Sequence, residues 1–298
     1  MYLKQLDENS KKYLHILYKK GYAKIPTFTA NIARNIFSST SHIFEANRVI
    51  KIEHQKKIPL HIYNPSGTEP TSIIIFFHSG GFVLRQWSIN SSLCKKIADV
   101  THSCVILVEY SLSPEEKFPK AIYEASTVIE WVHKNKKQLM QYDNIYLCGE
   151  SSGANLAIAA LINSKFFNIN GLILICPSLD YYNQYKSKEE FSSGYLLDKD
   201  VRLWFRNQYL NNPIERIDPL VSPLMSDQLH RLSNVLIINS YFDPLRDESI
   251  EFKNKLDQCG VKNRIETFDT IHGFFSLNIK PFSNNVLNII DKFINRIV

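Results

Sequence analysis

Strand-like and helix-like segments alternate along most of the chain, and this order predicts an α/β protein. Most of the strand-like segments are separated by segments with apolar residues at helical spacing. Strands that are apolar throughout are typical of a parallel sheet with helices on both faces. Five stretches are continuous apolar runs of strand length: Ile73–Phe77, Cys104–Val108, Ile145–Cys148, Leu172–Cys176 and Val235–Ile238.

Residues on both sides of these runs extend the predicted sheet. Residues 48–63 contain two amphipathic stretches, the second with apolar residues at alternate positions from Ile58 to Ile62, which indicates an antiparallel pair at a sheet edge. Ile265–Phe268 predicts the last strand, and Val286–Ile297 predicts a closing helix. The antiparallel pair, the five apolar runs and the last strand together make an eight-stranded, mostly parallel sheet.

Two segments outside this alternation predict a helical cap. Residues 1 to about 40 predict two helices, the second capped by Thr29 and carrying Ile32, Ile36 and Phe37. The first has one apolar stripe, formed by Leu6, Tyr13, Leu14, Leu17 and Tyr18.

The second segment lies between Asp180 and about Pro223, where no buried strand is readable. Asp198 is expected to cap a helix with four apolar residues on one face, namely Val201, Trp204, Phe205 and Tyr209. We expect this insertion to pair with the N-terminal helices as a lid. An ordinary helical excursion packed on the core is the alternative.

These patterns predict one large domain with added helices. The predicted cap helices comprise residues 1–44, the core comprises residues 45–180 and 215–298, and the cap insertion comprises residues 181–214.

Composition narrows the class of protein. The chain has 298 residues, of which 44% are hydrophobic and 21% charged, and the formal net charge of +6 is spread without long basic runs. Nucleic-acid and polybasic membrane binding are therefore not expected. The five cysteines show no metal-ligand spacing, which favours free thiols in a reducing compartment. The N-terminus lacks the seven-residue apolar core of a signal peptide, and no later stretch approaches the length of a transmembrane helix, so we expect a cytoplasmic protein without a stable membrane anchor.

Residues 146–156 carry the strongest chemical signal. The strand ending at Cys148 is followed by Gly149, Ser151 and Gly153, and then by an alanine-rich helix over residues 154–162. Gly-x-Ser-x-Gly between a strand and a helix is the nucleophile elbow, which exposes the serine hydroxyl on a strained turn. The two glycines are needed because side chains there would collide where the strand and the helix approach.

A nucleophilic serine needs a histidine base, and the histidine needs a carboxylate that fixes its tautomer. In α/β-hydrolase order the acid follows the serine and the histidine comes last, each just after a strand. Asp243 and His272 occupy such positions downstream of Ser151. Asp247 and Asp269 compete for the role of the acid, and Asp243 is preferred.

Acyl transfer also needs donors for the oxygen that becomes negative. Gly80 and Gly81 follow a buried strand and can turn their N–H groups inward because they lack side chains. With the N–H of Ser152 they would form a three-donor oxyanion hole. His78 is interpreted as a residue that braces this loop, and a simple strand-to-helix turn is the alternative to an oxyanion loop.

Six ordered motifs carry a specific resemblance, which covers the chain from about residue 45 to its end. They are His-Ser-Gly-Gly-Phe (78–82), Glu-Tyr-Ser-Leu-Ser-Pro-Glu (109–115) with Phe118-Pro119, Gly-Glu-Ser-Ser-Gly-Ala-Asn-Leu (149–156), Ser-Pro-Leu (222–224), Asp-Pro-Leu-Arg-Asp-Glu (243–248) and His-Gly-Phe (272–274). Together the chain resembles the hormone-sensitive-lipase family of α/β-hydrolases. The resemblance implies the α/β-hydrolase fold with a helical cap, cofactor-free and metal-free hydrolysis of carboxylic esters, and an acyl-enzyme on Ser151.

The chain departs from the family pattern at several positions. Ser79 replaces the first glycine of the usual His-Gly-Gly-Gly, Glu150 replaces the usual aspartate, and Ala154 stands where glycine is common. The usual Asp-Tyr-Arg-Leu-Ala-Pro has Ser111 in place of its arginine, which removes an expected loop-bracing ion pair. These changes spare the proposed donors.

The expected substrates are small-molecule esters with hydrophobic acyl groups of short to medium length. Large apolar side chains near the site or on the lid support this expectation. The alternatives are an amide or lactone hydrolase with the same triad, and a non-catalytic protein that binds a small ligand. A homodimer is a possible assembly. The candidate lining residues are Phe82, Trp87, Phe191, Trp204, Phe205, Leu245 and Phe274, with Tyr195, Leu197 and Phe275 as further apolar residues nearby.

Overall fold

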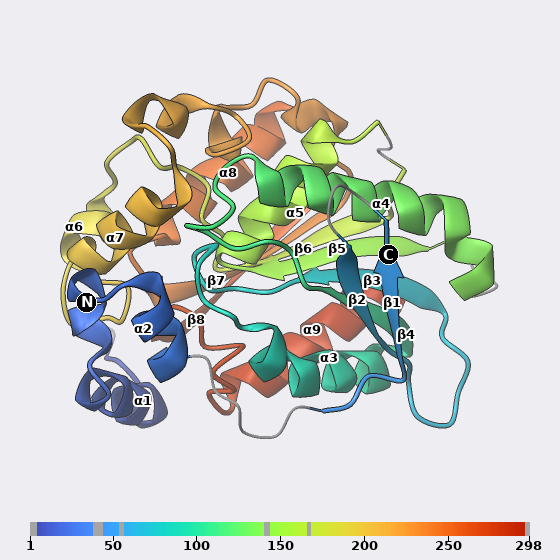
Figure 1. The fold of residues 1–298 in the computed structure, drawn as a ribbon, viewed down its shortest axis with the longest axis horizontal. Helices are drawn as coiled ribbons and strands as arrows, with labels where there is room; N and C mark the ends of the chain where they lie inside the picture. Colours follow the sequence, from blue (N-terminus) through green and yellow to red (C-terminus); the bar gives the residue numbers. More distant parts are fainter. Residues whose placement is uncertain (1–4, 38–43, 54–56, 140–143, 166–167, 296–298) are drawn as a thin grey trace.

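A sheet of eight strands runs through the middle of the molecule (Figure 1). The computed structural model describes residues 5–37, 44–53, 57–139, 144–165 and 168–295. The strand order is β1-β2-β4-β3-β5-β6-β7-β8. The strands are β1 (Arg48–Ile52), β2 (Ile58–Tyr63), β3 (Ser72–Phe77), β4 (Ser103–Val108), β5 (Ile145–Glu150), β6 (Gly171–Ile175), β7 (Val235–Phe242) and β8 (Asn263–Ile271).

The sheet is antiparallel at one edge and parallel elsewhere, as the pattern of apolar runs predicts. β1 pairs with β2 and β2 with β4 in antiparallel fashion, and the remaining pairs are parallel. In the parallel part Phe77 lies opposite Gly149, and Glu150 lies opposite Ile175. The carboxyl ends of β3, β5 and β6 therefore meet at one edge, where the loops that follow them can form a site.

Helices cover both faces of the sheet (Figure 1). Alternate side chains of the buried strands enter different clusters: Ile75 packs on one face and Ile74 on the other. On one side lie α4 (Lys120–Leu139), α5 (Ser152–Asn163) and α8 (Arg246–Gln258), and on the other lie α3 (Trp87–Thr101) and α9 (Phe282–Asn295).

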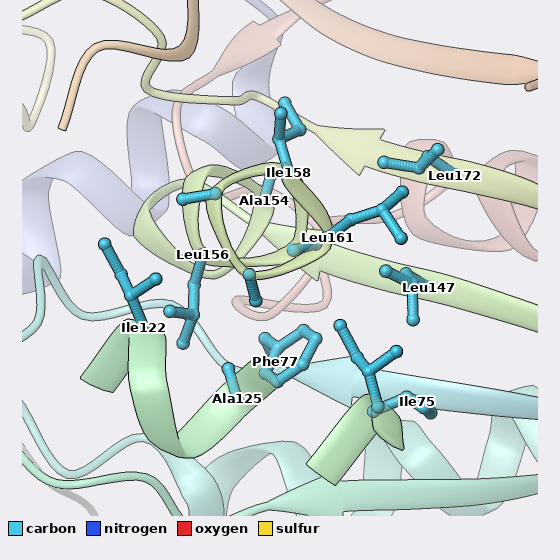
Figure 2. Close-up of a cluster of buried hydrophobic side chains, with 14 of the residues drawn as sticks. Ile75, Phe77, Ile122, Ala125, Leu147, Ala154, Leu156, Ile158, Leu161 and Leu172 are labelled. Carbon is cyan, nitrogen blue, oxygen red and sulfur yellow. The ribbon is translucent and has the colours of Figure 1, made fainter. Parts of the chain in front are cut away.

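Helix α5, which follows β5, is buried along almost its whole length. Every residue from Ser152 to Ile162 is buried, in agreement with a sequence that is apolar around the whole helix. Figure 2 shows Leu156, Ile158 and Leu161 of α5 among side chains of the strands and of α4. This packing fixes the helix that starts at Ser152.

The N-terminal helices pack against the insertion between β6 and β7 (Figure 1). The cap elements are α1 (Glu8–Lys19), the 3₁₀ helix η1 (Tyr22–Thr27), α2 (Ala30–Phe37), α6 (Lys186–Glu190) and α7 (Lys199–Tyr209). Short 3₁₀ helices η2 (Pro213–Ile217), η3 (Pro223–Met225) and η4 (Leu229–Arg231) lead back to β7. The short α6 is not predicted from sequence.

Directional hydrogen bonds join the two parts of the cap. Tyr18 Oη donates to Asp198 Oδ1 at 2.8 Å, and the indole N–H of Trp204 donates to the carbonyl of Phe28 at 3.1 Å. The predicted pairing of the N-terminal helices with the insertion agrees with these contacts. Asp198 precedes α7 as expected, but its side chain makes no capping bond to that helix.

Helix α2 buries only part of the apolar residues that it carries. Phe37 is buried, but Ile32 and Ile36 are exposed. The helix instead turns Ala33 and Arg34 inward, because the guanidinium group of Arg34 finds acceptors in the core. A buried arginine with partners outweighed the simple apolar pattern.

Within the described residues, no helix is both long enough and apolar enough to cross a membrane. All five cysteines are free; four are buried and Cys259 is exposed.

Candidate active site

Ser151 lies at the sharp turn between β5 and α5. Its backbone has φ 57° and ψ −118°, a conformation that costs of order 1–3 kcal/mol for a residue with a side chain. The turn is held because the N–H of Ser151 donates to the carbonyl of Ile175 at 2.8 Å. The packed strands and the buried helix on either side thus stabilise a strained residue with a partly exposed hydroxyl.

The two glycines of the turn are required by close backbone contacts. A Cβ atom on Gly153 would lie 2.0 Å from the carbonyl oxygen of Phe77, and one on Gly149 would lie 2.4 Å from the backbone of Gly153. The predicted collision between strand and helix is confirmed.

Three side chains from different loops form one hydrogen-bonded series. His272 follows β8, and its Nε2 lies 2.9 Å from Ser151 Oγ. Its Nδ1 lies 2.7 Å from Oδ2 of Asp243, which follows β7. With a neutral imidazole, Nδ1–H donates to the carboxylate and Nε2 accepts from the serine hydroxyl.

The competing carboxylates have other positions. Asp247 Oδ2 accepts from the backbone N–H of Ser187 at 2.8 Å, and its Oδ1 pairs with Arg246 Nε at 2.8 Å. Asp269 lies on β8, two residues before its end. Asp243 is the carboxylate in contact with His272, and its other oxygen accepts from the N–H of Leu245 at 2.8 Å.

The surrounding carboxylates change the pKa of His272. Burial of the imidazole lowers the pKa of His272, but the charge and hydrogen bond of Asp243 raise it, with further contributions from the charges of Glu150 and Glu248. The result is a raised pKa. The surroundings of His272 therefore stabilise the protonated form of the imidazole.

Glu150 is a buried carboxylate directly before the serine. It accepts from the N–H of Phe275 at 3.2 Å and from the N–H of Ser276 at 3.2 Å. Burial raises the pKa of Glu150, and these bonds partly offset that effect. Glu150 therefore anchors the loop that carries His272, a role that the sequence did not reveal.

Residues 78–86, which contain two of the predicted oxyanion donors and are called the oxyanion loop, follow β3. Gly80 and Gly81 have φ angles of 115° and 61°, which favour glycine. A Cβ atom on Gly81 would lie 2.4 Å from the ring of Phe205, so the loop backbone also packs directly against α7. Gly81 and Ser152 line one cavity with Ser151, as expected if their N–H groups are to serve one oxygen atom.

His78 is part of the structure of this loop. It is fully buried, its Nδ1 lies 2.7 Å from the carbonyl of Ser79, and its ring stacks on Tyr110 at 4.3 Å. Burial lowers the pKa of His78 to about 4, so the ring is neutral near pH 7. This agrees with the interpretation of a bracing residue.

Arg34 joins the cap to the oxyanion loop, a contact that the sequence did not indicate. Its guanidinium donates to the carbonyl of Val83 at 2.7 Å and to the carbonyl of Ser113 at 2.6 Å, and it forms a two-pronged ion pair with Glu115 at 2.7 Å. Ser111, at the position of the missing family arginine, donates to a different carboxylate. The loop is therefore braced from α2 rather than from within its own motif.

Two cavities meet at Ser151. The larger has a volume of about 390 Å³ and reaches toward α6 and α7, and the smaller, of about 140 Å³, reaches toward the N-terminal helices. Ser151, Gly81, Leu197 and Phe205 line both cavities.

Only part of the predicted lining lies at these cavities. Phe205 lines both and Leu245 lines the larger one. Phe82 stacks on Tyr209, Trp87 stacks on His61 in a separate surface cavity, and Trp204 donates to the main chain of the N-terminal segment. Phe191 and Phe274 are buried in the core cluster on the α3 and α9 side. Aromatic residues near the site in sequence are thus mainly packing residues.

Cys176, Asp243 and His272 offer three possible metal ligands within 4.8 Å of one another. Burial raises the pKa of the Cys176 thiol well above its ordinary value, which disfavours the thiolate that a metal would need. The histidine and the aspartate are already bonded to each other. The set therefore fits the hydrogen-bonded series better than a metal.

Comparisons with known proteins agree with this geometry. A family model described as alpha/beta hydrolase fold matches residues 74–276. Over 232 residues the chain is 30% identical to the carboxylic ester hydrolase LipN of Mycobacterium tuberculosis, covering 74% of the chain and 62% of LipN, so the chain spans less than two thirds of that relative.

Other relatives match over most of their length. The chain is 26% identical over 270 residues to an arylesterase of Saccharolobus solfataricus, covering 86% of the chain and 87% of the relative. A hyperthermophilic esterase from Pyrobaculum calidifontis has a similar structure, with a TM-score of 0.86, 27% identity and 98% of both chains covered. Because the family model matches more than half of its residues and the sheet has the expected topology, the chain belongs to the α/β-hydrolase family, in its hormone-sensitive-lipase type.

Proposed function

We propose that the chain is a serine carboxylesterase that forms an acyl-enzyme on Ser151. The observation that carries the proposal is the series of hydrogen bonds from Asp243 through His272 to Ser151, which opens on a cavity. Relatives named carboxylic ester hydrolase and arylesterase support the same reaction class.

In the first half of the reaction, Ser151 Oγ attacks the carbonyl carbon of the ester while His272 Nε2 accepts the hydroxyl proton. The negative charge that develops on the carbonyl oxygen is stabilised by the N–H groups of Gly80, Gly81 and Ser152 and by the N-terminus of α5. The C–O bond of the ester then breaks, and the leaving alcohol takes the proton from His272.

In the second half, a water molecule replaces the alcohol. His272 accepts a proton from the water, whose oxygen attacks the acyl carbon, and the same donors stabilise the second tetrahedral intermediate. When that intermediate collapses, the proton returns to Ser151 and the carboxylic acid leaves. Asp243 keeps the imidazole in the required tautomer throughout.

The cavities and the composition suggest the kind of substrate and the place of action. The smaller cavity, with Leu17, Tyr22 and Leu84 in its lining, supports small hydrophobic groups on one side of the ester. The free cysteines support a reducing compartment, for which we propose the cytoplasm.

The test is nucleophile labelling combined with mutation. Purified protein is expected to hydrolyse a short-chain nitrophenyl ester, and a phosphonate ester should label the peptide that contains Ser151. Ser151→Ala should lower the rate on the order of a millionfold and abolish the label, with an unchanged melting temperature as the control for folding. Unlabelled wild-type protein, or a variant that stays active, would refute the assignment.

A further inference from the structure

The position of His272 assigns the two cavities at Ser151 to the two halves of an ester. The leaving alcohol must take its proton from His272, and His272 lines the smaller cavity but is absent from the lining of the larger one. The alcohol therefore belongs in the smaller cavity. The acyl chain belongs in the larger cavity, which Ser152 also lines.

The larger cavity is not the apolar pocket that the sequence predicts. Four basic and three acidic side chains contribute to its lining, and three of the basic ones lie on α7. The basic residues are Lys188, Lys199, Arg202 and Arg206, and the acidic residues are Asp180, Glu189 and Glu248.

Two of the carboxylates already have partners. Glu248 is fully buried, forms an ion pair with Lys188 at 2.7 Å, and accepts from two backbone N–H groups. Asp180 accepts from the side chains of Tyr185 and Asn183 at 2.7 Å and from nearby backbone N–H groups. Glu189 is exposed. The acidic groups of the lining therefore need no further cation.

Among the described residues, Arg202 is a cation of this lining without a carboxylate partner. The side chain is partly buried, and its guanidinium donates to the carbonyl of Leu197 at 2.8 Å and to the carbonyl of Lys188 at 3.1 Å. In the part of the chain that the structure describes, no carboxylate lies within ion-pair distance of it. Since a guanidinium carries more N–H donors than these two bonds use, donors remain for a ligand.

The electrostatic surroundings leave this charge poorly compensated. Burial lowers the pKa of Arg202, and the more distant charges of Glu248, Asp243 and Asp198 offset only part of that effect. One helical turn further on, burial and the charge of Arg216 lower the pKa of Arg206. A desolvated cation beside a second cation favours an incoming anion.

We propose that Arg202 binds a carboxylate on the acyl chain, so that the preferred substrates are monoesters of dicarboxylic acids with a small apolar alcohol. A planar carboxylate matches the donors of a guanidinium group. Arg202 and Ser151 line the same cavity, so one acyl chain can contact both. This inference rests on the proposed esterase function and narrows its substrate class.

The test compares two esters of equal acyl length. Ethyl hydrogen adipate carries a terminal carboxylate, and ethyl hexanoate lacks it. The wild-type protein should have the higher kcat/KM for the adipate monoester, mainly through a lower KM. Arg202→Gln should reduce the ratio of the two kcat/KM values by roughly ten- to a hundredfold, as expected for loss of a charge-assisted hydrogen bond. Arg202→Lys should retain part of the preference.

Two controls separate this effect from net charge and from misfolding. Arg264→Gln removes one positive charge from an exposed residue of β8 that pairs with Glu266, and it should leave the ratio unchanged. Melting temperatures and inhibition by free adipate should be measured for each variant. Adipate should inhibit wild-type protein more strongly than hexanoate does, and Arg202→Gln should remove the difference.

The outcomes distinguish the inference from the proposed function. If the wild-type protein hydrolyses ethyl hexanoate as well as or better than the adipate monoester, or if Arg202→Gln keeps the preference, the inference is overturned while the esterase assignment stands. If neither ester is hydrolysed and the phosphonate does not label Ser151, the proposed function itself fails.

Discussion

Strands β3 to β6 are buried at every residue, whereas the cap helices α1, α2 and α7 each bury only a stripe of side chains. The core is therefore stabilised by continuous apolar packing, which acts along the whole length of each strand. The cap is joined to itself and to the core by a few directional contacts as well, among them Tyr18 with Asp198 and Arg34 with Glu115.

The core and the cap contribute differently to the proposed site. Ser151, Asp243 and His272 all follow strands of the core, so the proposed reacting groups are positioned by the buried sheet. Walls of both cavities come from the cap, including Leu197 and Phe205. We expect substitutions in the core site to lower kcat for every ester, and substitutions in the cap to act on stability, loop position and choice of substrate.

The largest effect that tests this comparison is expected from Asp243→Asn. The amide has nearly the same shape but no charge, so it favours the wrong imidazole tautomer and stabilises the imidazolium poorly. We expect kcat to fall by roughly ten-thousandfold for neutral and anionic esters alike. Steady-state kinetics on both substrates measure the effect.

Asp247→Asn is the matched control, because Asp247 lies four residues away and contacts Ser187 and Arg246 instead of His272. Its kcat should stay close to that of the wild-type protein. A large loss in Asp247→Asn together with an active Asp243→Asn would show that the wrong carboxylate had been chosen.

The core was also easier to predict from the sequence than the cap. The core strands were predicted because a run such as Ile73–Phe77 is apolar at every position and has one plausible environment. Ser151, Asp243 and His272 were predicted as a set because each follows such a strand and one chemistry requires all three. Local pattern and chemistry agree at these positions.

The cap was predicted only in outline. An apolar pattern does not reveal that Ile32 and Ile36 are exposed, or that Arg34 is buried and has a main-chain acceptor at Val83. Arg202 gave no signal either, because its proposed role depends on a cavity formed by distant segments and on the lack of a carboxylate partner among the described residues. Such features depend on three-dimensional packing.

An intermediate effect is expected where the cap meets the core. Arg34→Met keeps an apolar stem but leaves the carbonyl groups of Val83 and Ser113 without this donor, and it removes the pair with Glu115. We expect a loss of about 1–3 kcal/mol in the free energy of unfolding. Because Val83 belongs to the oxyanion loop, kcat should also fall, by about tenfold, while the preference between two esters is retained. Urea unfolding and steady-state kinetics measure both quantities.

Glu115→Gln is the control for the ion pair alone. The side chain of Glu115 is 55% exposed, whereas that of Arg34 is 5% exposed, so most of the loss in Arg34→Met should come from the unpaired carbonyl groups. Glu115→Gln should therefore cost less than about 1 kcal/mol. Equal losses in the two variants would contradict a bracing role through the main chain.

The smallest effect, a shift in pH dependence, is expected from Glu150→Gln. Only neutral His272 can accept the proton of Ser151, so kcat/KM should rise with pH as His272 loses its proton. The charge of Glu150 is one of the causes that raise the pKa of His272. Glutamine keeps an oxygen that can accept from Phe275 and Ser276 but removes the charge, so the pKa of His272 should fall. The acidic limb of the kcat/KM profile should then move to lower pH.

Glu124→Gln controls for the loss of any buried carboxylate, because Glu124 is also buried but binds Ser111 and is not among the charges that raise the pKa of His272. Its acidic limb should coincide with that of the wild-type protein. An acidic limb that stays in place or moves to higher pH in Glu150→Gln would mean that Glu150 acts on the histidine loop only through its hydrogen bonds. In that case displacement of the loop should lower the plateau of kcat/KM without moving the acidic limb. The pH profile therefore separates the effect of the charge of Glu150 from the effect of its hydrogen bonds.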